Sequence, residues 1–262
     1  MIVQEKVKVI VQLCAFIENE LRICHAYFPC SVGEQRHYGE LRVVCTKIEE
    51  APKEPGVWLT FMRTLEIADF KDGKAKPLVV KHIFLHNWFD ECFPLEKRRM
   101  LFLHYWANEM NDGISPIVVL CDTGNGRSGA LICFAYAKSL LKQKRLFNLT
   151  EVINQVAQQR WGICDSFWEY LFITVSLAQS LVEENILHYE DVQMSFLKYQ
   201  RFWNDRMAMM DKKRGDRMIQ CHHWVKQIDS DYYEEIVQKE KAKKRIQYEK
   251  CFKKKRTRKT RK

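Results

Sequence analysis

Three features that would assign a chain to a class at once are missing from this sequence. It has no charged-then-apolar leader at its start, and no uncharged run reaches the ~18 residues needed to span a bilayer. None of its ten cysteines stands at paired metal-ligand spacing. Cys221-His222-His223 lacks a second ligand cluster and is better interpreted as a polar helix face. We therefore expect no membrane span, no metal or other cofactor, and a reducing intracellular compartment, cytoplasmic or nuclear.

Apolar residues are plentiful, whereas positive charge is concentrated at one end. Apolar residues make up 47% of the 262 residues, and seven are tryptophan, which excludes a disordered chain. Residues 239–262 hold fourteen Lys and Arg against two acids, a local charge of +12. Because the whole chain has a net charge of +10, the first 238 residues carry −2. We expect a disordered basic tail that binds acidic partners non-specifically or directs the chain to the nucleus. Its few aromatic residues give no support for sequence-specific nucleic-acid binding.

The stretch PIVVLCDTGNGRSG, residues 116–129, has the most informative local pattern. A run of branched apolar residues predicts a buried strand that ends at Cys121. An apolar helix is expected from Ser128 to about Lys142. Cys121 and Arg127 thus bracket a glycine-bearing loop between a strand and the N-terminus of a helix.

Such a loop suits chemistry on an anion. Its backbone N–H groups can turn inward as an anion-binding nest, and the helix adds a positive dipole end. This field favours the nucleophilic thiolate of Cys121, and Arg127 supplies a planar fork that matches two phosphate oxygens. Ser128 is placed to donate to the sulfur and help it leave in a second step. The pattern predicts attack on phosphorus with a covalent thiophosphate. A buried structural cysteine followed by a surface arginine is the alternative, which ordered matches on both sides of the loop disfavour.

The loop C-x5-R-S-G resembles that of the cysteine-dependent phosphatases, and GxGRSG resembles the protein tyrosine phosphatase version most closely. Three other segments match that family in order: Cys24 to Pro29 (its K-C-x-x-Y-W-P), Trp88 to Pro94 (its acid loop W-P-D-x-G-V-P) and Arg160 to Ser166 (its R-x-x-x-x-Q-T). The resemblance covers residues 1 to about 185. It implies an α/β fold, a twisted mixed sheet flanked by helices, without the family's N-terminal part and its phosphotyrosine-stacking loop.

The resemblance also implies a role for each matching residue. Cys121 is the nucleophile, Arg127 binds the phosphate, and Ser128 assists release of the thiol. Asp90 is the general acid, and Glu18 is the carboxylate that pairs with the phosphate-binding arginine. The substrate-binding set adds the phosphate cradle, the hinge of the acid loop and the position beside the hydrolytic water: Asp122, Thr123, Gly124, Asn125, Gly126, Trp88 and Asp165.

Five positions depart from the family pattern. Leu120 replaces a histidine before the cysteine, and Phe89 and Cys92 replace the proline and glycine of the acid loop. Asp165 replaces the glutamine that positions water, and Ala157 replaces a structural arginine. Because the nucleophile, the arginine and the acid are kept, two functions stay open. One is a tyrosine phosphatase acting on phosphotyrosine-containing proteins. The other is a catalytically impaired pseudophosphatase that binds phosphotyrosine or a partner.

The remaining pattern divides the chain into three parts. Strands are predicted over residues 7–13, 39–48, 57–69 and 78–85, and helices over 95–111, 149–160 and 167–181. Residues 1–185 are expected to form the phosphatase-like domain. Residues 186–238 are expected to be a helical extension, with a helix over 189–210 that packs on the domain or on a partner. Residues 239–262 are the tail.

Overall fold

A computed structural model of the chain describes residues 1–18, 21–50, 60–69, 76–85, 88, 93–94, 96–164 and 166–206. Its strands are β1 (Val9–Gln12), β2 (Ile17–Glu18), β3 (Leu21–Arg22), β4 (Gln35–Tyr38), β5 (Leu41–Glu50), β6 (Thr60–Asp69), β7 (Leu78–Leu85) and β8 (Ile117–Leu120). Its helices are α1 (Arg99–Glu109), α2 (Gly126–Lys142), α3 (Leu149–Ala157) and α4 (Phe167–Glu183), followed by a helical segment over 189–206. No described helix is both long and apolar enough to cross a membrane.

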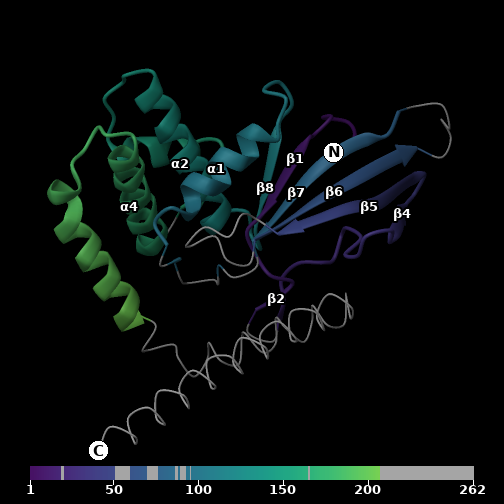
Figure 1. The fold of residues 1–262 in the computed structure, drawn as a ribbon, viewed down its shortest axis with the longest axis horizontal. Coiled ribbons are helices and arrows are strands. Elements are labelled where there is room, and N and C mark those ends of the chain that lie inside the picture. Colours follow the sequence, from purple (N-terminus) through teal and green to yellow (C-terminus); the bar gives the residue numbers. More distant parts are fainter. Residues whose placement is uncertain are drawn as a thin grey trace, which may run out of the picture.

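The main sheet is mixed and has the order β4-β5-β6-β7-β1-β8. Strands β4 to β7 pair antiparallel, whereas β1 lies parallel to both β7 and β8. The sheet and the helices lie side by side, and β8 stands at the edge nearest to α1 and α2 (Figure 1). The predicted α/β fold, a mixed sheet flanked by helices, is confirmed. The parallel pairing places the end of β8 beside the end of β1, where Leu13 N–H donates to the carbonyl of Leu120 at 2.9 Å.

Alternation along the central strands separates two apolar clusters. Val9 and Val11 of β1 face the helices, in the cluster that holds the buried side chains of all four. Ile10, between them, belongs to a second cluster on the other face, which the segment containing Phe16 and Phe28 covers. A period of two along a strand produces this division. The first cluster reaches Cys121 and therefore supports the end of β8 from below.

Predicted boundaries are accurate where the apolar pattern is regular. Strand β7 has the predicted limits, and α4 extends the predicted helix by two residues. Helix α1 begins at Arg99, later than the predicted residue 95, and Arg99 N–H bonds the carbonyl of Glu96 in a tighter turn. Strand β4 was not predicted, because its sequence QRHY is polar and mostly exposed.

The helical segment 189–206 packs on the domain. Phe196 and Tyr199 are 4% and 1% exposed and belong to the first apolar cluster, the one between the sheet and the helices. The Tyr199 hydroxyl donates to the carbonyl of Pro94, and Trp203 Nε1 donates to the carbonyl of Phe93 at 3.1 Å. The extension therefore contacts the last two residues of the segment that resembles the family's acid loop. Residues 207–262, including the predicted tail, lie outside the described part, so the domain limits stay predictions.

A buried histidine lies in the face opposite to the helices. His82 of β7 is fully buried, and its Nε2 is 3.0 Å from the Tyr27 hydroxyl and 3.3 Å from Gln12 Oε1. Burial lowers the pKa of His82 well below 6.5, and the charge of Arg63 lowers it further. His82 is therefore neutral in the folded chain at neutral pH.

This burial predicts acid sensitivity. An unfolded histidine binds a proton near pH 6.5 while folded His82 does not, so stability is present above that pH and is lost as the pH falls below it. Between about pH 7.5 and 5.5, His82 should lower the free energy of unfolding by about 1.4 kcal/mol. Urea unfolding at both pH values measures it. His82→Gln should remove this part of the pH slope, and His188→Gln, at an exposed position, should keep it. Equal slopes in both variants would contradict the assignment.

Candidate active site

The end of β8 places a cysteine sulfur in a loop of backbone donors. Cys121 follows the strand and is 7% exposed. The backbone N–H of Gly124 donates to its Sγ at 3.2 Å. Gly124 has φ +77, a left-handed conformation that disfavours residues with a side chain. Gly124 thus lets the backbone turn back toward the Cys121 sulfur before α2 begins at Gly126.

A second glycine lets α2 approach the segment before α4. A Cβ built on Gly129 would lie 2.4 Å from Ile163 Cγ1 and 2.9 Å from the backbone nitrogen of Cys164. The Asn125 carbonyl accepts from the N–H groups of both Gly129 and Cys164, at 2.9 and 3.3 Å. The start of α2 is thus pressed against this segment, which fixes the loop relative to the core.

Arg160 holds the outer side of the same loop. Its Nε donates to Asn125 Oδ1 at 2.8 Å, and another of its nitrogens donates to the carbonyl of Thr123 at 2.9 Å. These bonds hold the Thr123 carbonyl against the Arg160 guanidinium group. With the carbonyl on this outer side, the loop N–H groups are favoured to point toward the inside of the loop.

Arg127 is buried under the loop and already has partners. Its side chain is 2% exposed, and one terminal nitrogen donates to the carbonyl of Trp88 at 2.7 Å. The other lies 3.0 Å from Asp122 Oδ1. Burial opposes the charge of Asp122, but Arg127 and a hydrogen bond from the Thr123 N–H outweigh it, so the pKa of Asp122 lies below 3.8. An ion pair therefore links the residue after Cys121 to the arginine near the end of the loop.

Two further polar side chains border the start of α2. Ser128 is 1% exposed, and its Oγ has no hydrogen-bond partner among the described residues. Glu169 forms a capping box with Ser166 at the start of α4. A Cβ built on Gly126 would lie 2.8 Å from Glu169 Oε1, so this carboxylate stands beside the N-terminus of α2. A carboxylate is electrostatically favoured there.

The structure brings together part of the predicted site. Cys121, Arg127, Ser128 and the cradle residues 122–126 meet around one loop, and the Trp88 carbonyl contacts Arg127. Asp90 and Asp165 lie outside the described residues, as do Phe89 and Cys92. The backbone of Glu18 is in β2, but its side chain is not described, so its pairing with Arg127 stays a prediction. The catalytic roles themselves also stay predictions.

Sequence reasoning missed the contacts that Asp122, Arg160 and Glu169 make. Asp122 entered the predicted site only as part of the backbone cradle, yet its side chain pairs with Arg127. Arg160 was part of the family match but had no assigned role. For the contact of Asp122, the available sequence signal was an acidic residue directly after the cysteine. The capping pattern S-x-x-E was the signal for Glu169.

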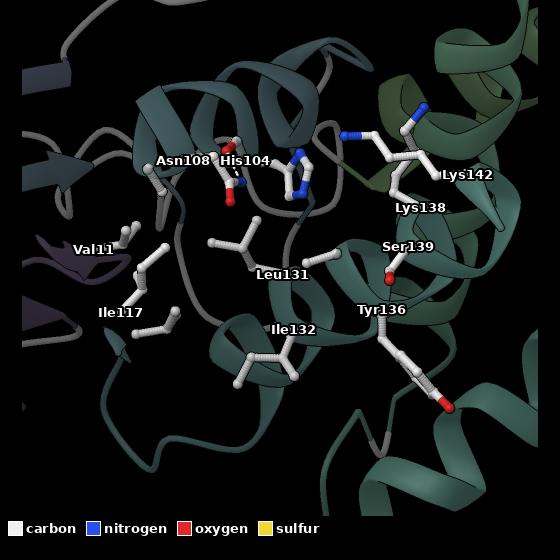
Figure 2. A pocket seen from close by; sticks show the side chains of 13 residues that line it. Val11, His104, Asn108, Ile117, Leu131, Ile132, Tyr136, Lys138, Ser139 and Lys142 are labelled. Atoms are coloured by element: carbon white, nitrogen blue, oxygen red, sulfur yellow. Dashed lines mark hydrogen bonds between the residues drawn. The ribbon is translucent and has the colours of Figure 1, made fainter. Parts of the chain in front are cut away.

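The described cavity of about 520 Å³ lies away from the loop. It is lined by α1, α2, β1 and β8, with Leu131 in the middle, Val11 and Ile117 at one end and Lys138 and Lys142 at the other (Figure 2). Burial lowers the pKa of His104 in its wall, and both lysines lower it further. The wall includes none of the predicted site residues. In the described part of the chain, no three His, Cys, Asp or Glu side chains gather where they could hold a metal ion.

Comparison with known proteins places this loop in a family. A model of the protein-tyrosine phosphatase family matches residues 1–179. Tyrosine-protein phosphatase non-receptor type 18 of Homo sapiens is 26% identical over 198 residues, which are 71% of this chain and 40% of that protein. Non-receptor type 13 of Mus musculus is 24% identical over 174 residues, 66% of this chain and 7% of that protein.

Solved structures show the same fold. The catalytic domain of human non-receptor type 18 superposes with a TM-score of 0.61 at 24% identity, covering 68% of this chain and 62% of that one. The same phosphatase has been solved with HER2 phosphopeptides, and that structure matches with a TM-score of 0.60 at 24% identity, covering 68% of this chain and 59% of that one. The chain spans less than half the length of these curated relatives and about 60% of these solved chains. With a family match that runs through β8, the cysteine loop and most of α4, the chain belongs to the protein-tyrosine phosphatase family.

Proposed function

We propose that the chain is a protein tyrosine phosphatase that hydrolyses phosphotyrosine through a cysteinyl-phosphate intermediate. The observation that carries this proposal is the position of the Cys121 sulfur, which accepts the Gly124 N–H at the mouth of a loop that also holds Arg127. A phosphate in that loop meets backbone donors, a helix N-terminus and a guanidinium group at once. These groups stabilise the charge on the equatorial oxygens in the transition state.

The first step transfers the phosphoryl group to sulfur. The Cys121 thiolate attacks phosphorus, an S–P bond forms, and the bond between phosphorus and the tyrosyl oxygen breaks. Asp90, assigned by resemblance, gives its proton to the leaving tyrosyl oxygen. Arg127 and the loop N–H groups hold the transferred group in place.

The second step releases phosphate. Asp90 takes a proton from water, the water oxygen attacks phosphorus, and the S–P bond breaks to return the thiolate. The Ser128 hydroxyl, which has no partner in the described part of the chain, is suited to donate to the departing sulfur. Asp165 stands where the family's glutamine positions this water, which points to a slow second step.

A second candidate function is phosphotyrosine or partner binding without turnover. The ion pair between Asp122 and Arg127 favours it, because a carboxylate already pairs with the guanidinium group that a phosphate would need. The departures at Leu120, Phe89 and Asp165 favour it as well. Phosphotyrosine-containing proteins are the proposed partners of either function, and the solved relative bound to HER2 phosphopeptides supports this proposal.

The proposed setting is intracellular, cytoplasmic or nuclear. The family relatives include non-receptor phosphatases. The proposal for residues 239–262 is non-specific binding of acidic partners or nuclear import, both through their local charge.

A pair of peptides tests the substrate class. We expect a phosphotyrosyl peptide to be hydrolysed at least about tenfold faster than a phosphoseryl peptide of the same sequence. Cys121 is only 7% exposed, so its sulfur lies below the surface and suits the longer reach of a tyrosyl phosphate. Release of inorganic phosphate under steady-state conditions measures both rates. Equal rates would refute the preference, and no hydrolysis of either peptide would favour the binding function.

A further inference from the structure

Asp122 presents a carboxylate to the same guanidinium group that the proposed function assigns to phosphate. Asp122 Oδ1 lies 3.0 Å from the terminal nitrogen of Arg127. The two residues belong to one loop, with Cys121 directly before the carboxylate. A carboxylate and a phosphate present similar oxygen pairs to an arginine fork. Asp122 therefore already pairs with the cation that the proposed function assigns to the phosphate.

The two partners differ in their freedom to move. Arg127 is 2% exposed, and its other terminal nitrogen donates to the Trp88 carbonyl at 2.7 Å, so its position is fixed from two sides. The Asp122 side chain is 23% exposed and lies in the loop. When a ligand enters, the acid is the group that can turn away to solvent. Asp122 is also the group that a phosphate repels, because the two anions would share one cation.

We propose that Asp122 is an affinity-setting residue that competes internally with the phosphate group for Arg127. Binding of a phosphate dianion then requires the Asp122–Arg127 pair to separate, and its cost lowers the affinity for every phosphorylated ligand. This inference rests on the proposed function, because it presumes that the loop takes phosphate. A residue that merely held Arg127 in place would have the opposite effect when neutralised.

Neutralising Asp122 should raise the affinity for phosphate if Asp122 competes with it, and lower that affinity if Asp122 only positions Arg127, so one experiment separates the two roles. Asp122→Asn keeps the shape and removes the charge, and Asp122→Ser is a smaller second variant in case the first folds poorly. Asp191→Asn makes the same charge change on the exposed part of segment 189–206 and serves as the matched control. Inorganic phosphate and tungstate are titrated into each 262-residue variant by calorimetry, and the melting temperature is measured without ligand. Arg127→Lys reports on binding in the loop itself.

We expect Asp122→Asn to lower the Kd for phosphate by on the order of tenfold or more, while the ligand-free melting temperature falls. The loss of a partly buried ion pair explains the lower stability, and the loss of the competitor explains the tighter binding. Asp191→Asn should change neither. The same gain in affinity is expected for Asp122→Ser.

Two results would overturn the inference. Unchanged or weaker phosphate binding in both Asp122 variants, with binding still lost in Arg127→Lys, would make Asp122 a positioning residue and leave the proposed function intact. Absence of oxyanion binding in every variant would remove the competition altogether. Hydrolysis of a phosphotyrosyl peptide by the unmodified chain, measured in parallel, separates this second result from failure of the proposed function.

Discussion

Replacing Cys121 with serine should abolish turnover and leave binding largely intact. We expect the rate of phosphotyrosyl hydrolysis to fall by about 10⁴-fold or more, because a hydroxyl is a far poorer nucleophile than a thiolate at neutral pH. The Gly124 N–H and Arg127 remain in the loop, so the Kd for a phosphotyrosyl peptide should change by less than about threefold. Phosphate release and fluorescence anisotropy of a labelled peptide measure the two effects.

A matched thiol separates chemistry from stability. Cys30 is also buried, at 2% exposure, but it belongs to the apolar cluster on the opposite face of the sheet. Cys30→Ser makes the same atomic change far from the loop and should keep the rate wherever the variant is folded. Substantial activity in Cys121→Ser would show that another group is the nucleophile.

The second large effect concerns the slow step. Asp165 stands where the family has the glutamine that positions water, and Phe89 stands in place of the acid-loop proline. In the proposed mechanism the first step needs Cys121, Arg127 and Asp90, whereas the second also needs a well-placed water. We therefore expect breakdown of the cysteinyl-phosphate to limit the rate. The double change Asp165→Gln with Phe89→Pro should raise turnover by about tenfold or more, because it restores a part of the roughly 10²–10⁴-fold that general acid–base assistance contributes.

Rapid-quench kinetics locate the step that changes. The unmodified chain should release a burst of the tyrosyl product in the first turnover, and the double variant should show a smaller burst with a faster steady state. Each single variant serves as a control for the other position. Measurable turnover without any burst would place the slow step earlier, at formation of the intermediate. In that case Leu120 and Asp122 would become the relevant departures.

The strand, loop and helix at the centre of the candidate site could be predicted from the sequence, because their signals are local. Branched apolar residues before Cys121 and an apolar helix after Ser128 are enough to predict a strand, a turn and a helix. The loop's glycines agree with that geometry, since Gly124 adopts a left-handed φ and Gly129 permits close packing. The order of the parallel strands was not predictable in the same way, because β1 and β8 are paired by tertiary packing.

The side-chain contacts around the loop could not be derived from local pattern. Asp122 sits next to the nucleophile in sequence, but whether it faces solvent or Arg127 depends on the direction the loop takes after the strand. The contact of Arg160 with Asn125 joins residues thirty-five positions apart. The polar strand β4 has no apolar alternation and exists because β5 pairs with it. Each of these features depends on tertiary structure.

The most direct test of the account is to trap the intermediate. The 262-residue chain is mixed with a phosphotyrosyl peptide, quenched in acid within the first turnover, digested and examined by mass spectrometry. We predict a phosphoryl group on the peptide that contains Cys121, at a level that approaches the amount of enzyme because its breakdown is slow, and no such adduct in Cys121→Ser. Product release without a phosphorylated Cys121 at any time point would contradict the proposed mechanism.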